Sequence, residues 1–213
     1  MVAAVAPAPS AVTGFYRARL ATGNAALLTR VGNLWQAMFD PKDVNGSVSR
    51  ISGVVSGWVT GAQAGAQAET LAYLRGLYSA TTGRPYPSVG PFRPAPGLVG
   101  SAADGTTVGR VTGVTPSVYW ARKGSGLSDQ MAAESALAWL NRLASSEPYR
   151  VANETTMWSA SNDDRFTGRV IRLTRSNACA FCVQIADRGY LPSHAGFAAH
   201  AHCHCTPGPE VQS

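Results

Sequence analysis

The stretch FYRARLATGNAALLTRVGNLWQAMF, residues 15–39, decides how the N-terminal part of this chain folds. Apolar side chains recur along it at close to the helical repeat, so a helix formed here would have one apolar face and one polar face. An amphipathic helix is therefore expected over these residues. Its apolar positions are Tyr16, Leu20, Leu27, Val31, Leu34 and Met38.

A turn and a second helix are expected next. The segment DPKDVNGS contains a proline and a glycine, and both residues disfavour helical backbone. Ser47 or Ser49 can then cap a helix that runs to about Thr82. Because two long helices joined by a short turn pack side by side, residues 15–83 are predicted to form an antiparallel helical hairpin.

The second helix carries an unusual number of glycines. They stand at four-residue spacing and so form a slowly drifting stripe along one face: Gly53, Gly57, Gly61 and Gly65. Each glycine weakens a helix by about 1 kcal/mol relative to alanine, so close packing against the backbone of the first helix is the expected compensation. A membrane span is the alternative, because the residues between Arg50 and Glu69 are uncharged. The polar and glycine residues among them argue against it, and no membrane contact is predicted.

The first residues, MVAAVAPAPSAV, lack the basic start and the long apolar run of a secretory signal. Their alanine and proline content predicts a flexible arm over residues 1–14. The protein is therefore expected to be made in a cytoplasm.

Residues 84–126 are dense in proline and glycine and show no sustained hydrophobic period, which predicts an extended connector between two bodies. The connector is also basic. Of the formal net charge of +6, residues 84–127 carry an excess of four basic side chains, whereas residues 128–213 carry an excess of one acidic side chain. Since affinity for phosphate follows local cationic density, nucleic-acid contact is predicted here, with ordinary solvation as the alternative. The candidate residues are Arg84, Arg93, Arg110, Arg122 and Lys123.

Residues 127–213 are predicted to form a separate C-terminal module. A helix capped by Ser128 buries Met131, Leu137, Leu140 and Ala144. A second helix starts at Ser145 or Ser146, carries Pro148 in its first turn, and buries Val151, Thr155 and Trp158. The alternating, β-branched stretch GRVIRLT at 168–174 predicts a strand.

The fold class expected from these elements is α+β and predominantly helical. It comprises the N-terminal antiparallel helical hairpin, the Gly/Pro-rich connector and a small C-terminal α+β module with a Cys-rich knuckle. Hydrophobic residues make up 45% of the chain and charged residues 14%, which fits a globular protein whose sparsely charged surfaces are covered by partners.

All four cysteines lie between Cys179 and Cys205, in CAFC at 179–182 and HAHCHC at 200–205. Such clustering favours a metal site over the disulfides of a secreted protein. Two residues between the first pair allow both sulfurs to face one ion. If residues 200–205 are extended, alternation places Cys203 and Cys205 on one face and the histidines on the other.

The predicted metal site is therefore a structural zinc held by Cys179, Cys182, Cys203 and Cys205. If a turn bends the segment, His200 or His202 is the alternate ligand, and the sequence leaves this choice open. Four thiolates around Zn²⁺ leave a net charge of −2, which Arg169, Arg172 and Arg175 on the incoming strand can offset. Disulfides in an oxidised particle and free thiols are the alternatives to zinc.

Catalytic patterns are missing from the sequence. It contains neither HExxH nor the deaminase pattern H-x-E followed by P-C-x-x-C, and it has no P-loop and no GxSxG. Ser193 and His194 are neighbours in sequence rather than members of a triad. The protein is expected not to be an enzyme and to take no small-molecule substrate.

The C-terminal third resembles the MuF-type minor capsid, or head morphogenesis, proteins of tailed bacteriophages, most closely the version from phages of actinobacteria. The resemblance covers about 70 residues and combines a strand, a C-x-x-C, a basic-glycine-aromatic turn and a closing H-x-x-C-x-C. The matching residues are Cys179, Cys182, Arg188, Gly189, Tyr190, His200, Cys203 and Cys205.

This resemblance implies a virion component at the portal or head interior, made in the host cytoplasm, that acts in head assembly or in DNA packaging and ejection. The portal protein, the major capsid protein, or both are the implied partners, with packaged DNA as a further candidate. Some relatives are labelled capsid maturation proteases. A zinc-stabilised nucleic-acid-binding module and a protease are the alternative functions.

Overall fold

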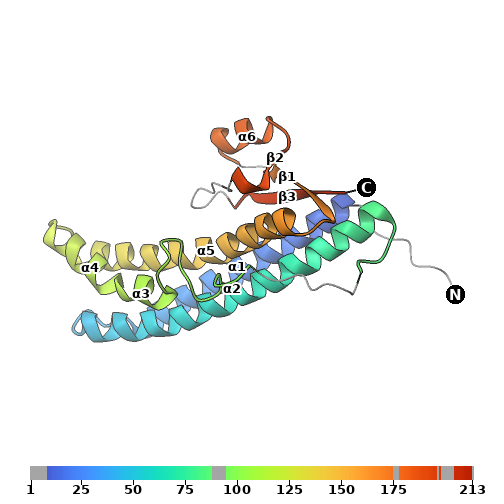
Figure 1. Cartoon of the computed structure of the whole chain (residues 1–213). Coiled ribbons are helices and arrows are strands. Elements are labelled where there is room, and N and C mark those ends of the chain that lie inside the picture. Colours follow the sequence, from blue (N-terminus) through green and yellow to red (C-terminus); the bar gives the residue numbers. More distant parts are fainter. Residues whose placement is uncertain (1–8, 88–94, 175–177, 196, 198–203, 213) are drawn as a thin grey trace. The chain divides into compact units, whose positions relative to one another are not determined.

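The computed structural model describes residues 9–87, 95–174, 178–195, 197 and 204–212. The fold is α+β and predominantly helical, with a small antiparallel sheet near the C-terminus, so the expected fold class is confirmed (Figure 1). The chain divides into two compact units. Unit 1 comprises residues 1–21, 65–96 and 149–213, and unit 2 comprises residues 22–64 and 97–148.

The N-terminal hairpin consists of α1, Pro9–Met38, and α2, Val44–Thr82. The helix α1 begins at Pro9, so the predicted arm over residues 1–14 is wrong from Pro9 onward, and residues 1–8 lie outside the described residues. The cap of α2 also differs from the expectation. The Asp43 carboxylate accepts a hydrogen bond from the Gly46 amide at 3.0 Å, whereas Ser47 donates its hydroxyl proton to the Asp43 carbonyl.

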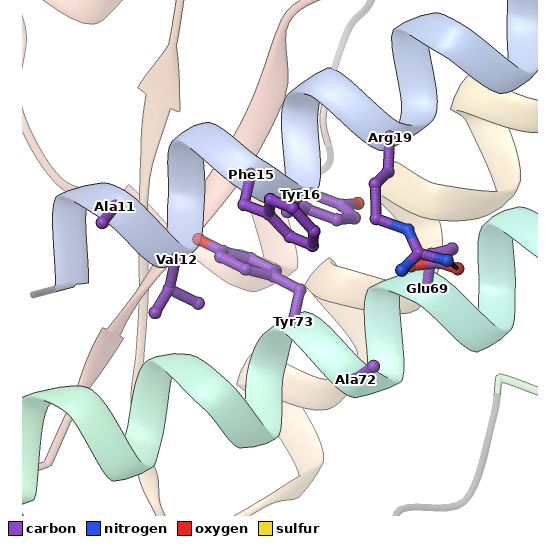
Figure 2. Close-up of a pocket in the computed structure, with 8 residues that line it drawn as sticks. All are labelled: Ala11, Val12, Phe15, Tyr16, Arg19, Glu69, Ala72 and Tyr73. Carbon is purple, nitrogen blue, oxygen red and sulfur yellow. Dashed lines mark hydrogen bonds and ion pairs between the residues drawn. The ribbon is translucent and has the colours of Figure 1, made fainter. Parts of the chain in front are cut away.

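In unit 1, aromatic side chains join the first turns of α1 to the last turns of α2. The rings of Tyr16 and Tyr73 stack with centroids 4.2 Å apart and an interplanar angle of 6° (Figure 2). The Tyr16 hydroxyl lies 2.9 Å from the Thr70 hydroxyl. Burial raises the pKa of both tyrosines, so both remain neutral around pH 7.

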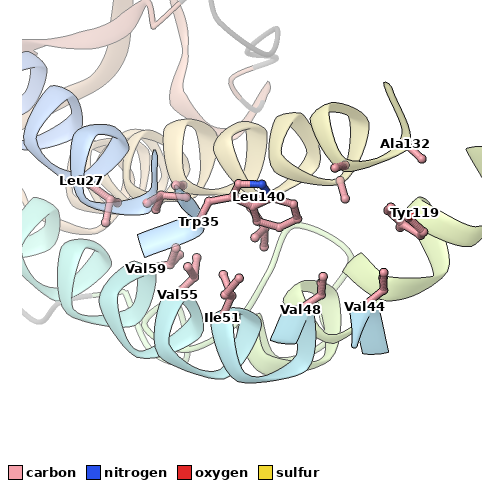
Figure 3. Close-up of a cluster of buried hydrophobic side chains, with 14 of the residues drawn as sticks. Leu27, Trp35, Val44, Val48, Ile51, Val55, Val59, Tyr119, Ala132 and Leu140 are labelled. Carbon is pink, nitrogen blue, oxygen red and sulfur yellow. The ribbon is translucent and has the colours of Figure 1, made fainter. Parts of the chain in front are cut away.

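In unit 2, a continuous apolar core runs between the remaining parts of α1 and α2 and the N-terminal part of α5, Asp129–Asn162 (Figure 3). The buried positions of α1 and α2 follow the helical repeat that the sequence shows. The core residues are Leu27, Val31, Trp35, Val44, Val48, Ile51, Val55, Val59, Val108, Tyr119, Ala132, Ala133, Ala136, Leu140 and Ala144.

The prediction of an extended connector over residues 84–126 is wrong for its C-terminal part. Residues Val108–Gly113 form α3 and Thr115–Gly124 form α4. Thr107 caps α3 through its side chain, and α4 carries a proline in its first turn, so both helices have ordinary start signals. Val108 and Tyr119 anchor them in the core of unit 2, where only 1% of Tyr119 is exposed.

The two helices expected within residues 128–162 are a single helix, α5, with Pro148 in its interior. Proline lacks an amide proton, so α5 loses one backbone hydrogen bond there without ending. Val151, Thr155, Leu140 and Ala144 are buried as predicted. The predicted burial of two side chains is wrong: Met131 is 52% exposed and Trp158 is 40% exposed.

The glycine stripe of α2 does not pack against another backbone within the described residues. A Cβ atom added at Gly53, Gly57, Gly61 or Gly65 would meet no heavy atom within 4 Å other than the adjacent backbone of α2 itself. The expected compensation by close packing on the first helix is therefore wrong. None of the helices, over the part of the chain that the structure describes, has the length and apolar character that a membrane crossing requires.

The sheet of unit 1 has the strand order β2-β1-β3, with both pairs antiparallel. The strands are β1, Phe166–Leu173, β2, Leu191–Pro192, and β3, Thr206–Val211; β1 confirms the predicted strand. The helix α6, Ala180–Ala186, and the short 3₁₀ turn η1, Ser193–Ala195, lie between β1 and β3 in sequence. Phe166 and Val170 of β1 share an apolar cluster with Tyr149, Ala152, Met157 and Ala160 of α5, which attaches the sheet to that helix.

The turn between α5 and β1 is held by Asp163. Its carboxylate accepts hydrogen bonds from the Tyr86 hydroxyl at 2.7 Å and from the backbone amide of Arg165 at 3.0 Å. The Arg165 guanidinium pairs with the same carboxylate and lies over the Tyr86 ring, 4.1 Å from its centroid. Burial raises the pKa of Asp163, but the hydrogen bonds from Arg165 and Tyr86 outweigh burial and leave the pKa lowered. This arrangement also ties the residues after α2 to the start of β1.

Candidate functional site

The cysteines that the structure describes belong to the C-terminal part of unit 1. Cys179 is the N-cap residue of α6 and is partly buried, whereas Cys182 lies in the first turn of that helix and is fully buried. Cys205 directly precedes β3 and is also fully buried. None of these three thiols is in a disulfide.

Arg172 on β1 places a positive charge beside one of the described thiols. Its Nη1 donates a hydrogen bond to Cys182 Sγ at 3.6 Å, and its guanidinium lies 4.0 Å from the centroid of the Phe197 ring. Only 7% of Arg172 is exposed. Burying a guanidinium is costly unless hydrogen bonds, aromatic contacts or opposite charge offset the lost hydration. Arg172 therefore ties β1 to α6 at the first turn of the helix.

The other side of the cysteine region is held by α5. The Asn153 side-chain amide donates to the backbone carbonyl of Cys205 at 3.3 Å, inside the protein. Four residues earlier on the same helix, the Tyr149 ring stacks on His204, with centroids 4.3 Å apart and an interplanar angle of 2°. Tyr149 and Asn153, one helical turn apart on α5, thus contact His204 and Cys205 directly before β3.

The conformation of His204 contradicts part of the argument from alternation. Its φ is +47°, which is left-handed backbone rather than the extended backbone that the alternation of residues 200–205 requires. The reason for placing Cys203 and Cys205 on one face is therefore wrong at this residue. Cys203, His200 and His202 themselves lie outside the described residues.

The described cysteines do not make a metal site by themselves. Among residues 9–87, 95–174, 178–195, 197 and 204–212, no group of three or more His, Cys, Asp or Glu side chains is arranged to hold a metal ion. A zinc site would need donors from the segment that contains Cys203, His200 and His202. The four-cysteine site therefore stays a prediction.

The two remaining arginines of the predicted neutralising set differ from Arg172. Arg169 pairs with Glu210 of β3 at 3.4 Å and lies over the Tyr190 ring, with its side chain 54% exposed. Arg169 therefore links β1 to β3, and the Glu210 carboxylate offsets its positive charge. Arg175 lies outside the described residues.

Apart from Thr155, whose burial was predicted, sequence reasoning missed the buried polar side chains of α5. Asn153, Thr155, Thr156 and Ser159 are buried, and among the residues that the structure describes the Asn153 Oδ1, Thr155 Oγ1 and Ser159 Oγ atoms find no hydrogen-bond partner. The same holds for Thr206 Oγ1, directly after Cys205. A signal was present, since the polar side chains of YRVANETTMWSAS recur at helical spacing where an apolar face was expected. Buried polar groups of this kind mark the places that ordered water or a ligand atom can satisfy.

Ser193 and His194 do not form a catalytic pair with a described acid. The buried Ser193 hydroxyl lies 2.5 Å from the Ser161 hydroxyl at the end of α5, and His194 is exposed. This contact attaches η1 to α5. It offers no general base to the serine.

The predicted nucleic-acid residues are distributed over both units. Arg110 on α3 and Arg122 on α4 are exposed and make no ion pair with the described residues. Lys123 instead pairs with Asp129 at 2.9 Å, so a neighbouring carboxylate partly offsets its positive charge. Arg84 is exposed in unit 1, and Arg93 lies outside the described residues.

A hollow of about 420 Å³ opens between α1 and α2 in unit 1 (Figure 2). Aromatic and small apolar side chains line it, and the stacked rings of Tyr16 and Tyr73 belong to its wall. The ion pair of Arg19 and Glu69 stands at one end. We refer to this hollow as the Phe15 groove, because the side chain of Phe15, which is 67% exposed, forms part of its rim.

Comparison with known proteins identifies the family to which the chain belongs. The family model described as VG15 protein matches residues 100–213, just over half of the chain, and the chain belongs to this phage-associated family. The matched region contains α3 to α6 and the whole sheet, and thus the cysteine region described above. VG15 is a phage structural-type family, and no enzyme family is matched. No curated protein and no solved structure matches the chain.

Proposed function

We propose that this chain is a minor capsid, or head morphogenesis, protein of MuF type that acts at the portal and head interior of a tailed phage. The observation that carries the proposal is membership of the VG15 family over the region that contains the cysteine pattern. The buried positions of Cys182 and Cys205, joined to β1 and α5 through Arg172 and Asn153, fit a compact module whose cysteines serve the fold. Such a module presents a fixed surface to partners in a particle.

The proposed role is assembly of the head, or packaging and ejection of its DNA, through contact with the portal protein or the major capsid protein. The test is an amber codon in the gene for this chain, within the phage or prophage that carries it. In a non-suppressing host we expect particles that lack the chain and have few full heads or little infectivity. Particles of normal DNA content and infectivity that lack the chain would contradict the proposal.

The implied partner is tested separately. We expect the purified chain to co-sediment with the assembled portal of the same phage. Major capsid protein assembled without portal serves as the comparison. Binding to neither assembly would contradict the proposed location.

A nucleic-acid-binding module is the second candidate function, and one observation favours it. Arg110 and Arg122 expose their guanidinium groups on α3 and α4, free of ion pairs within the described residues. A double Arg110→Ala, Arg122→Ala variant should then bind duplex DNA more weakly and with a shallower dependence on salt, since each phosphate contact contributes to the slope. Equal binding and equal slope for both proteins would exclude these residues from contact with DNA.

A further inference from the structure

The Phe15 groove combines a cavity with an exposed aromatic side chain on the same surface. Phe15 has the largest exposed fraction, 67%, of the exposed large hydrophobic side chains in the described residues. Single exposed apolar residues are common on protein surfaces, but an exposed aromatic beside an apolar hollow is typical of an interaction site. The hollow of about 420 Å³ can accept a benzyl side chain.

One wall of the groove is made of two buried aromatic rings that pack on each other. Tyr16 and Tyr73 are 4% exposed, their rings stack, and their hydroxyls bond to Thr70 and Thr13. Because each ring is held by the other ring and by a hydroxyl contact, neither ring fills the hollow.

The charges beside the groove are self-complementary. Arg19 and Glu69 pair at 2.5 Å, and their side chains keep 54% and 32% of their surface exposed. One surface therefore carries an acid, a base, an apolar knob and an apolar hollow. Two copies related by a two-fold axis would present each of these features to its complement, because residue i then meets residue j while residue j meets residue i.

We propose that a second copy of this chain docks on the Phe15 groove in an isologous contact. Phe15 of each copy enters the groove of the other, and Arg19 of each copy pairs with Glu69 of the other. The proposal does not depend on the head morphogenesis role, because α1 and α2 lie outside the region that the VG15 family matches.

The first experiment measures the mass of the full chain by analytical ultracentrifugation over a range of concentrations. We expect a reversible shift from 22.2 kDa to twice that mass. Phe15→Ser should remain a monomer under the same conditions, whereas Met131→Ser, which removes an exposed apolar side chain from unit 2, should still dimerise. A wild-type protein that stays monomeric, or a Phe15→Ser variant that dimerises normally, would overturn the proposal.

The second experiment tests whether Arg19 and Glu69 pair between two copies rather than within one copy. Arg19→Glu and Glu69→Arg should each remain monomeric, because each homodimer would face like charges. A mixture of the two variants should regain dimers of mixed composition, since each copy then supplies the charge that the other lacks. If the mixture fails to associate while both variants are as helical as the wild type by circular dichroism, the proposed ion pairs between copies are contradicted. If either single variant does not fold, the Phe15→Ser comparison decides the proposal.

Discussion

Gln63 on α2 donates a hydrogen bond from its side-chain amide to the carboxylate of Glu147 on α5, across 3.2 Å in the interior of unit 2. The same two side chains hold a loop. Gln63 accepts from the Gly100 amide and donates to the Ser101 carbonyl, both at 2.8 Å, and Glu147 accepts from the Ala103 amide at 3.3 Å. The loop before α3 is thus tied to two helices by side chains distant in sequence.

Replacing Gln63 by leucine should destabilise the protein by about 1–3 kcal/mol, the usual cost of leaving buried polar partners unsatisfied. The loop amides of Gly100 and Ala103 should also exchange with solvent faster. Urea unfolding and hydrogen exchange measure the two effects. Glu134→Gln, an exposed position on α5, is the control and should change neither. Unchanged stability and exchange in Gln63→Leu would show that the network does not hold the loop.

Asp163 makes the stability of the protein depend on pH. Because its folded pKa lies below its usual value, its ionisation stabilises the fold fully above the unfolded pKa, which is about 3.9. This contribution is lost as the pH falls through the lowered folded pKa. Asp163→Asn should therefore reduce stability at pH 7 by about 1.5–3 kcal/mol, the range for hydrogen bonds to a charged group, and flatten the acid limb of a stability–pH curve. Parallel curves for the variant and the wild type would contradict this assignment.

Arg172 should protect the Cys182 thiol. In the folded wild type, a bulky thiol reagent should modify the partly buried Cys179 faster than the fully buried Cys182. Arg172→Ala should increase the rate at Cys182 while leaving Cys179 unchanged, because it removes the side chain that joins β1 to the sulfur. Peptide mapping by mass spectrometry measures the two rates. Arg169→Ala serves as the control, since that side chain contacts Glu210 and Tyr190 instead.

The predicted structural zinc has a direct measurement. Elemental analysis of the purified full chain is expected to find one zinc per chain, and Cys179→Ser or Cys205→Ser should lower the zinc content and unfold the C-terminal module. The helical signal of residues 15–82 should persist in both variants. A chain free of zinc, with unchanged melting temperatures in both variants, would exclude a structural metal and leave burial of the thiols as their role.

The helices and the main strand could be predicted because their signals are local. The repeat of apolar residues in α1 and α2 and the alternation in β1 each lie within a single segment. The short helices α3 and α4 were missed because glycine and proline dominate their surroundings. What holds them is the packing of Val108 and Tyr119 against residues of α1, α2 and α5. Pro148 was misread for a related reason, since α5 continues past this proline with buried side chains on both sides of it, whereas proline would end an isolated helix.

In the candidate site too, local spacing predicted some features, and only the tertiary structure revealed the others. Spacing alone selected Cys179 and Cys182 as a pair and Arg172 as a companion. Only the folded chain brings Asn153 to the carbonyl of Cys205, 52 residues away, and Tyr149 to His204. The sequence by itself determined the fold class, the hairpin and the clustering of the thiols, because these depend on neighbours along the chain. The tertiary structure decided which polar groups are buried together, because each such contact depends on how α5, β1 and β3 pack.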